Sequence, residues 1–205
     1  MARTQAADFD KRREAIMATA AGLYAKKGFL GASVAEIAAA CQTSKSLIYY
    51  YYPSKEDILF DVMDSHVQSL TEAARVIDET EDDPRSKVRR IAAALMELYA
   101  GHEANQKVLL NELANLPADR RTIIVDHQRQ LLDLMDTILL SIRPDLKLDR
   151  PTRRALVMMF FGMLNWTLTW FDPTGPIKNH EIADIASAMF LAGIAESAPT
   201  RPKGA

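Results

Sequence analysis

The apolar residues of this chain recur at helical spacing along almost its whole length, and this periodicity limits the fold more than any other feature. Within residues 10–27, for example, Ile16, Ala20 and Tyr24 share one side of a helix. No segment alternates β-branched and polar residues between hairpin turns, as paired strands do. The pattern therefore predicts an all-α protein of about nine helices.

Glycine, proline and capping residues divide this pattern into separate helices. Gly28 is expected to end the first helix as a C′ glycine, and Pro53 to end the third. The expected helices cover about residues 10–27, 33–41, 44–50, 54–79, 85–100, 103–115, 118–141, 151–171 and 179–195. The segments 1–9 and 197–205 are expected to be flexible tails.

Composition excludes several other classes of protein. No apolar run is long enough to cross a membrane, and the N-terminus has no signal-peptide pattern. With one cysteine, an intramolecular disulfide cannot form. Residues 1–60 hold eight of the 25 Lys and Arg but only six of the 27 Asp and Glu, so this segment has a net charge of +2 while the rest of the chain has −4. We expect a cytoplasmic protein without membrane partners, metal or cofactor.

Two short helices follow each other around residues 33–52. Ser33 and Glu36 form a capping-box sequence at the start of the first. A turn near Gln42 separates it from the second, and this outline is typical of a helix-turn-helix.

The second of these short helices has two different sides. Ile48, Tyr51 and Tyr52 are spaced to pack inward. Lys45 and Tyr49 lie on another side and carry groups that bond to phosphate oxygens and base edges. A recognition helix in a major groove needs one apolar side and one such polar side, so we expect this helix to contact DNA.

The segment SVAEIAAACQTSKSLIYYYYPSKEDIL resembles the N-terminal domain of the TetR/AcrR family of bacterial transcriptional regulators. The resemblance extends over about residues 10–59, and it implies a DNA-binding domain over 10–60 followed by a helical ligand-binding and dimerisation domain over 61–196. There are two departures: Gln42, where the family usually has glycine at a turn position that favours positive φ, and Tyr50, where the family often has histidine. The DNA-contacting residues implied by the resemblance are Ser33, Thr43, Ser44, Lys45, Ser46, Tyr49, Tyr50 and Lys55.

The larger domain carries more apolar surface than a single core needs. The segments 151–171 and 179–195 are apolar on more than one side, and the simplest account is an isologous homodimer. A dimer also suits the reading of two half-sites in a palindromic operator. The expected interface residues are Met159, Met163, Trp166, Trp170, Ile185 and Met189.

The segment GMLNWTLTWFDPTGPI, residues 162–177, resembles a pattern in one branch of the family. Several regulators of that branch respond to acyl-CoA thioesters, so the resemblance implies a small hydrophobic effector of this kind. Basic residues within 85–90 or 150–154 could contact the CoA phosphates. The expected ligand pocket consists of Met63, Met96, Tyr99, Leu109, Leu113, Met135, Phe161 and Asn165. Asn165 could bond to a ligand or across the dimer.

Three functions remain open at this point. A ligand-responsive repressor agrees with all the patterns, and a ligand-dependent activator would have the same sequence features. A helical adaptor that binds only protein would not need the side formed by Lys45 and Tyr49. An enzyme is not expected because no nucleophile, zinc-protease or phosphate-loop motif is present, although His66 and His127 could share a metal site.

Overall fold

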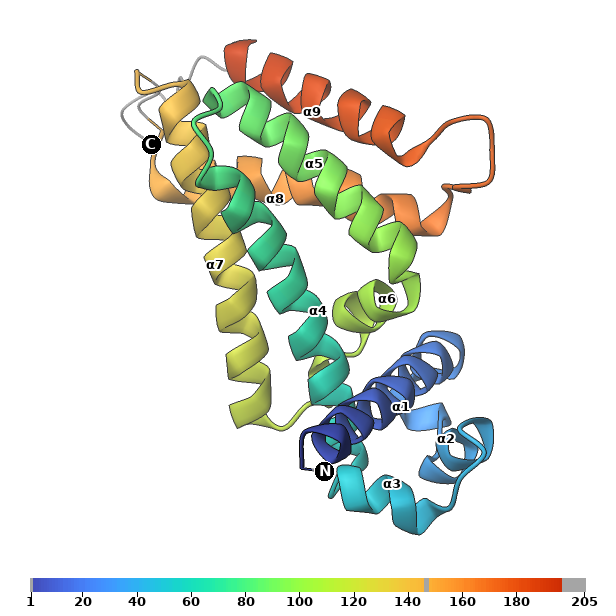
Figure 1. The fold of residues 1–205 in the computed structure, drawn as a ribbon. Helices are drawn as coiled ribbons and strands as arrows, with labels where there is room; N and C mark the ends of the chain where they lie inside the picture. Colours follow the sequence, from blue (N-terminus) through green and yellow to red (C-terminus); the bar gives the residue numbers. More distant parts are fainter. Residues whose placement is uncertain (1, 146–147, 197–205) are drawn as a thin grey trace. The chain divides into compact units, whose positions relative to one another are not determined.

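The computed structural model describes residues 2–145 and 148–196, and these residues confirm the all-α prediction (Figure 1). They form nine α-helices and two short 3-10 helices. The α-helices are α1 (Ala2–Gly31), α2 (Val34–Ala40), α3 (Lys45–Tyr51), α4 (Lys55–Asp78), α5 (Pro84–Gly101), α6 (Glu103–Asn111), α7 (Ala118–Ile142), α8 (Arg150–Trp166) and α9 (Asn179–Glu196), and the 3-10 helices are η1 (Leu113–Asn115) and η2 (Thr167–Thr169).

The helices belong to two compact units. The first unit consists of Met1–Ser69 and His102–His127, and the second consists of Leu70–Gly101 and Gln128–Ala205. Helices α4 and α7 each contribute residues to both units. The expected functional division after residue 60 remains a prediction, because compactness alone does not identify the residues that touch DNA.

In the first unit, α1, α2 and α3 share one apolar core. Ile16, Ala20 and Tyr24 of α1 are buried, as their spacing predicts. Ile37 of α2 and Ile48 of α3 are completely buried with them. Burying an isoleucine side chain such as that of Ile37 or Ile48 contributes roughly 1.5–3 kcal/mol, so the inward side of α3 is held firmly.

Helix α1 is longer than the sequence pattern predicts. Gly28 has the positive φ of 74° expected of a terminating glycine, but the chain returns to helical conformation and α1 continues to Gly31 with a kink. Gly28 therefore interrupts the helix where the sequence predicted its end, and a short further helical segment extends α1 to Gly31. Residues 2–9, predicted as a flexible tail, belong to the first turns of α1, whereas the predicted tail 197–205 lies outside the described residues.

The turn between α2 and α3 has an unusual backbone conformation. Gln42 has φ 52° and is the one non-glycine residue with positive φ in the part of the chain that the structure describes. This confirms the sequence interpretation of position 42 as a turn that favours glycine. The left-handed conformation costs a residue with a Cβ roughly 1–2 kcal/mol.

Replacing Gln42 by glycine is therefore expected to stabilise the protein by about 1 kcal/mol, since part of the gain is offset by the greater freedom of glycine in the unfolded chain. The free energy of unfolding in urea measures this change. Gln42→Ala is the matched control, because alanine has a Cβ and the same backbone cost. An equal gain from both variants would mean that strain at φ is not the cause.

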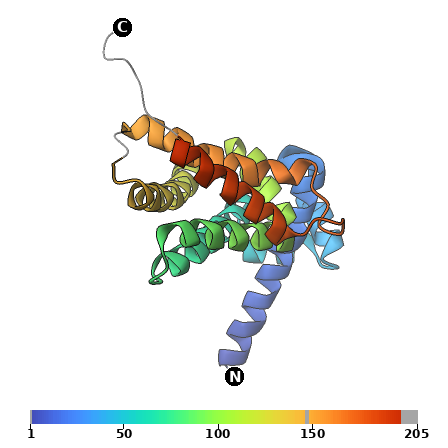
Figure 2. The ribbon, with the colours of Figure 1, turned by 90° about the horizontal axis from the view of Figure 1, so that it is seen from above.

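The second unit is built around α5, α8 and α9. Helix α9 packs against both α5 and α8, and Figure 2 shows the three helices together from above. Phe160 of α8 is completely buried, with its ring centroid 5.0 Å from that of Phe190 on α9. Ile91 and Leu95 bring α5 into the same core. These contacts fix α8 and α9 while leaving other sides of both helices at the surface.

Candidate nucleic-acid interface

Helix α2 begins with a complete capping box. The Glu36 backbone N–H donates to Ser33 Oγ at 3.2 Å, and the Ser33 backbone N–H donates to Glu36 Oε2 at 2.8 Å. A hydrogen bond from the Lys27 ammonium, together with those from Ser33, lowers the pKa of Glu36 to about 2. The carboxylate therefore stays ionised in any ordinary buffer, and the start of α2 keeps its cap.

Helix α3 begins with a serine N-cap and exposes one side. Ser44 Oγ accepts a hydrogen bond from the Leu47 backbone N–H at 3.2 Å. Tyr49 is 49% exposed and Tyr50 is 71% exposed, whereas Ile48 of the same helix is buried. We call the exposed side, formed by Lys45, Ser46, Tyr49 and Tyr50, the α3 outer face.

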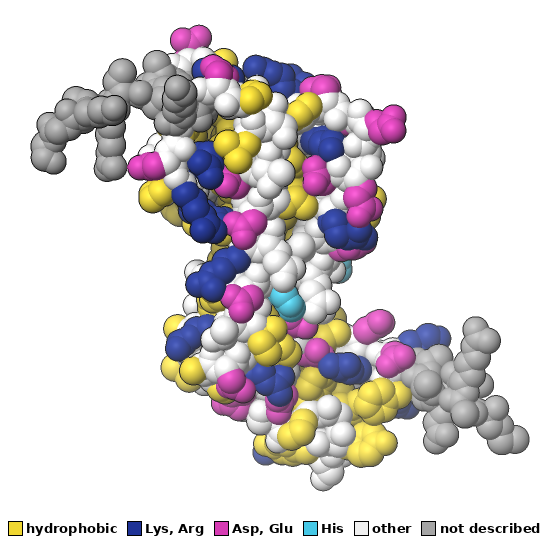
Figure 3. Space-filling view, turned by 90° about the vertical axis from the view of Figure 1, so that its left-hand side faces the viewer, with side chains coloured by type: hydrophobic (Ala, Val, Ile, Leu, Met, Phe, Trp, Pro, Cys, Tyr) yellow, Lys and Arg dark blue, Asp and Glu magenta, His cyan; other side chains and the backbone are white. Residues whose placement is uncertain are grey.

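The remaining residues implied to contact DNA lie close to this face in the sequence. Ser33 and Ser44 are exposed at the starts of α2 and α3, and Thr43 is half-buried in the turn between them. Figure 3 shows Lys and Arg side chains beside hydrophobic ones on the surface of the first unit. Such a mixture of cations, hydroxyls and aromatic rings suits phosphate and base contacts. These DNA contacts remain predictions.

The end of α3 is fixed by a polar triad that the sequence did not reveal. Tyr52 Oη donates to Asp61 Oδ2 of α4 at 2.5 Å. Arg13 of α1 donates to Asp61 Oδ1 at 2.8 Å and to Tyr52 Oη at 3.3 Å. Burial raises the pKa of Tyr52, so its hydroxyl remains a donor. The expected packing of Tyr52 in the core is confirmed, while Tyr51 is only half-buried.

Lys55 makes contacts within the first unit. Its ammonium donates to the backbone carbonyl of Phe29 and lies 4.0 Å from the centroid of the Phe29 ring. The side chain is half-buried. An ammonium has three N–H donors, so a phosphate contact would have to use the donors that are not bonded to the Phe29 carbonyl. The expected phosphate contact of Lys55 stays a prediction.

The histidines that could have shared a metal site have protein partners instead. His66 Nε2 is 2.7 Å from Gln106 Oε1, and His127 Nδ1 is 2.9 Å from Asp64 Oδ1. Among the residues that the structure describes, no group of three or more His, Cys, Asp or Glu could hold a metal ion. The structure therefore gives no support to a shared site of His66 and His127.

Most residues of the expected ligand pocket are buried. Asn165 and Leu113 are half-buried exceptions. The Tyr99 hydroxyl donates to Asn165 Oδ1 at 2.9 Å, which gives the amide a partner within the same unit. The buried members are Met63, Met96, Tyr99, Leu109, Met135 and Phe161. That these residues bind a ligand remains a prediction.

An open groove in the first unit lies elsewhere. It has a volume of about 350 Å³ and shares no residue with the expected pocket. Helices α1 and α6 form it, and Lys107 on its wall is paired with Glu103 at 2.5 Å. The full lining is Gly22, Ala25, Lys26, Glu103, Ala104 and Lys107.

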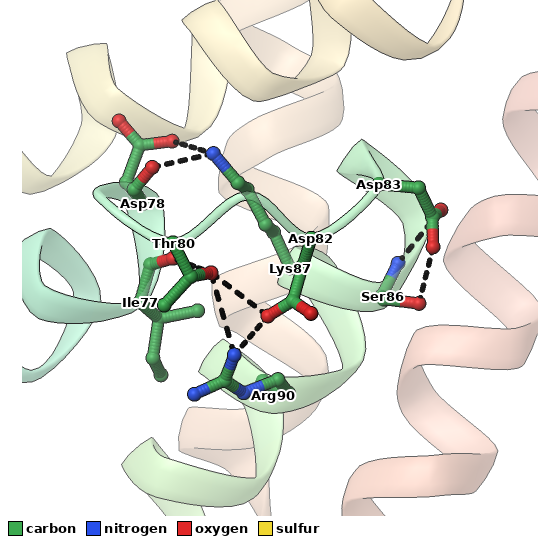
Figure 4. A network of polar contacts seen from close by, with 8 residues as sticks. All are labelled: Ile77, Asp78, Thr80, Asp82, Asp83, Ser86, Lys87 and Arg90. Atoms are coloured by element: carbon green, nitrogen blue, oxygen red, sulfur yellow. Dashed lines mark hydrogen bonds and ion pairs between the residues drawn. The ribbon is translucent and has the colours of Figure 1, made fainter.

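The basic residues considered as phosphate ligands are mostly committed to ion pairs. In the corner between α4 and α5, Arg90 pairs with Asp82, and Lys87 binds the backbone carbonyl and carboxylate of Asp78 (Figure 4). Asp83 caps α5 in the same corner through Ser86.

The second basic cluster is held in the same way. Arg153 of α8 pairs with Asp136 of α7 at 2.9 Å, and Arg154 pairs with Asp133. Sequence reasoning missed these acidic partners because the pairs join different helices. Four of the cations considered as phosphate ligands within 85–90 and 150–154 therefore already have acidic partners: Lys87, Arg90, Arg153 and Arg154.

Helices α8 and α9 expose large apolar side chains. We call the set predicted as a dimer interface the α8–α9 apolar face. Its exposed fractions range from 53% for Ile185 to 67% for Trp166, and Met163 is half-buried. The other members are Met159, Trp170 and Met189. In the described residues no helix is both long and apolar enough to cross a lipid bilayer.

A capped three-helix unit with an exposed polar and aromatic α3, joined to further helices, defines a helix-turn-helix DNA-binding protein. Comparison with protein families agrees. Residues 16–62 match the model described as bacterial regulatory proteins, tetR family, and residues 81–194 match the tetracyclin repressor-like C-terminal domain. The chain belongs to the TetR family of DNA-binding transcriptional regulators, which are not enzymes.

Relatives cover nearly the whole chain. A TetR-family regulator from Bordetella parapertussis 12822 is 34% identical, covers 92% of this chain and 98% of its own, and has a TM-score of 0.85. The transcriptional repressor KstR2 of Mycobacterium tuberculosis is 23% identical over 197 residues, 92% of this chain and 96% of KstR2. AibR, solved with isovaleryl coenzyme A and operator DNA, is 28% identical, covers 87% and 97% of the two chains, and has a TM-score of 0.75.

Proposed function

We propose that this protein is a ligand-responsive repressor that binds a palindromic operator as a homodimer. Its DNA affinity changes when a small hydrophobic effector, an acyl-CoA thioester, binds the C-terminal domain. The observation that carries the proposal is the α3 outer face, where Lys45 and Tyr49 are exposed while Ile48 anchors the same helix. A helix of this kind can enter a major groove without losing its core contacts.

The homodimer is supported by the α8–α9 apolar face. Side chains such as Trp166 and Met159 are about two-thirds exposed in the single chain, at 67% and 66%. A large exposed apolar patch on a compact unit is typical of a protein interface. Two copies related by a two-fold axis would present two α3 helices to two half-sites.

The effector class is supported by relatives and by the chemistry of the second unit. AibR was solved with an acyl-CoA, and it shares 28% identity with this chain over most of its length. Met96 and Met135 supply deformable apolar surface, and the Tyr99–Asn165 pair supplies polar groups beside it. A thermal-shift series with acyl-CoA esters of increasing chain length, with free CoA as the control, tests this class. No stabilisation by any ester would contradict it.

A ligand-dependent activator is a second candidate, because AibR was solved with isovaleryl coenzyme A and operator DNA in one complex. In that relative, effector and DNA binding are compatible. Gel shifts with and without the stabilising ester decide between release and retention of DNA. Release supports the repressor, whereas stronger binding supports the alternative.

Operator recognition can be tested through Tyr49. A DNA duplex is first selected from a random library by the full-length protein. Tyr49→Ala is then expected to lower affinity for the selected duplex about tenfold and to change affinity for a scrambled duplex much less, because base contacts carry sequence information and phosphate contacts do not. Fluorescence anisotropy at one fixed salt concentration measures both affinities.

Tyr49→Phe is the matched control, since it keeps the aromatic ring and removes only the hydroxyl. If Tyr49→Ala lowers affinity for the two duplexes equally, Tyr49 contacts the DNA backbone and not the bases. If no duplex is enriched by selection, the DNA-reading role of the α3 outer face is wrong.

A further inference from the structure

Three aromatic rings meet at the surface where α1 approaches the end of α3. The Phe9 ring of α1 lies 4.6 Å from the Tyr51 ring, between centroids, with a tilt of 37°. It also meets the Tyr50 ring edge-on at 6.2 Å. The Tyr50 and Tyr51 rings are themselves perpendicular, with centroids 5.2 Å apart. All three distances and angles are those of attractive aromatic pairs.

This arrangement is not explained by the core of the first unit. Phe9 remains 37% exposed and has no polar group that could favour the surface. It lies two helical turns before Ile16, and no residue from 9 to 15 is buried. The ring contacts of Phe9 are therefore made mainly with Tyr50 and Tyr51.

Tyr50 depends on these contacts for its orientation. The residue is 71% exposed, so little of its side chain is fixed by burial. An exposed tyrosine on a helix can still exchange between the two χ1 rotamers that the helical backbone permits. Edge-on contacts with two neighbouring rings restrict that choice, because a rotation that moved the Tyr50 ring away from Phe9 and Tyr51 would break both pairs.

We propose that Phe9 is a positioning residue for DNA recognition, holding Tyr50 of α3 in the orientation that contacts the duplex. The proposal rests on the DNA-reading role of the α3 outer face. Tyr52, Asp61 and Arg13 fix the backbone at the end of α3, and Phe9 adds the restraint on the exposed side chain. An ordered side chain loses less conformational entropy on binding, so affinity increases without a new contact to DNA.

The test uses the full-length protein and the duplex selected from the random library. Phe9→Ala is expected to weaken binding about fivefold, a loss comparable to that of one aromatic pair. Phe9→Trp, which keeps an aromatic ring, is expected to bind within about twofold of the original protein. Leu110→Ala is the matched control, since Leu110 is an exposed apolar residue of the same unit, at 42%, on α6.

A double-mutant cycle separates positioning from general stability. If Phe9 acts through Tyr50, then Phe9→Ala in a Tyr50→Ala background weakens binding no further. Additive losses of the two substitutions would overturn the proposal. Equal melting temperatures of Phe9→Ala and the original protein show that the fold is unchanged.

A second measurement needs no DNA. With 3-fluorotyrosine incorporated and the resonance of Tyr50 assigned by its loss in Tyr50→Phe, Phe9→Ala is expected to shift that ¹⁹F resonance, since the neighbouring ring is removed. An unmoved resonance would overturn the proposal. A shifted resonance together with no selected duplex would instead show that the ring contact exists and that the DNA-binding role assigned to the α3 outer face is wrong.

Discussion

Replacing Trp166 by arginine is expected to convert the proposed homodimer into a monomer and to lower affinity for the selected duplex by at least about 100-fold. Trp166 is the most exposed member of the α8–α9 apolar face, at 67%. A two-fold interface would bury the substituted position twice, and an unpaired buried charge costs several kcal/mol. The loss of 100-fold corresponds to about 2.7 kcal/mol, which two such charges exceed.

Sedimentation velocity at micromolar concentration measures the oligomeric state directly. Val76→Arg is the matched control, because Val76 is also an exposed apolar residue of the second unit, at 51%, but lies on α4. The control is expected to remain dimeric and to bind the duplex normally. A dimeric Trp166→Arg variant would show that α8 and α9 do not form the interface.

Acidification from pH 7.5 to 4.5 is expected to destabilise the protein through His66 by about 2–3 kcal/mol. His66 of α4 is 3% exposed, and burial lowers its pKa from 6.5 to about 4. Its hydrogen bond with Gln106 raises the pKa only partly, and nearby His102 lowers it further.

The direction follows from proton uptake. Between pH 6.5 and about 4 the unfolded chain protonates this histidine and the folded protein does not, so the unfolded state gains stability as the pH falls. Above about pH 7 both states are neutral and the contribution is constant.

Urea unfolding at pH 7.5 and 4.5 measures this loss, with His66→Gln as the variant. The variant is less stable at pH 7.5 if the packing of the imidazole matters, but its loss on acidification should be smaller by about 2–3 kcal/mol. His180→Gln, at an exposed position on α9, should retain the full pH dependence. If His66→Gln loses as much stability as the original protein, another group is responsible.

Features that depend on neighbouring residues in the sequence were predicted well. The capping box of Ser33 and Glu36 is present. Gln42 adopts the positive φ expected at its turn, and Ile48 is buried on the inward side of α3. The capping box and the burial of Ile48 follow from local backbone chemistry and helical spacing, whereas the positive φ at position 42 was implied by the family resemblance.

Features that depend on distant residues were not predictable in the same way. Arg13 and Asp61 are 48 positions apart, and Tyr99 and Asn165 are 66 positions apart. The chain contains many carboxylates and many guanidinium groups, and the sequence does not show which of them pair. The same reasoning applies to Lys55, whose carbonyl partner belongs to Phe29 on another helix.

Helix ends were also harder to predict than helix interiors. Gly28 breaks the helical conformation as expected, but the short helical segment that follows it and extends α1 to Gly31 was not predicted. The segment predicted as one helix over 151–171 changes to the 3-10 helix η2 after Trp166. Small differences in packing decide such ends, and they leave little trace in the pattern of apolar residues.

The carboxyl group of Glu36 and the imidazole of His66 take up protons at different pH values as the folded protein is acidified. Glu36 keeps its negative charge down to about pH 2, whereas His66 begins to favour the unfolded chain below about pH 6.5. Mild acid therefore weakens the interior where α4 meets α6 well before it releases the first turn of α2.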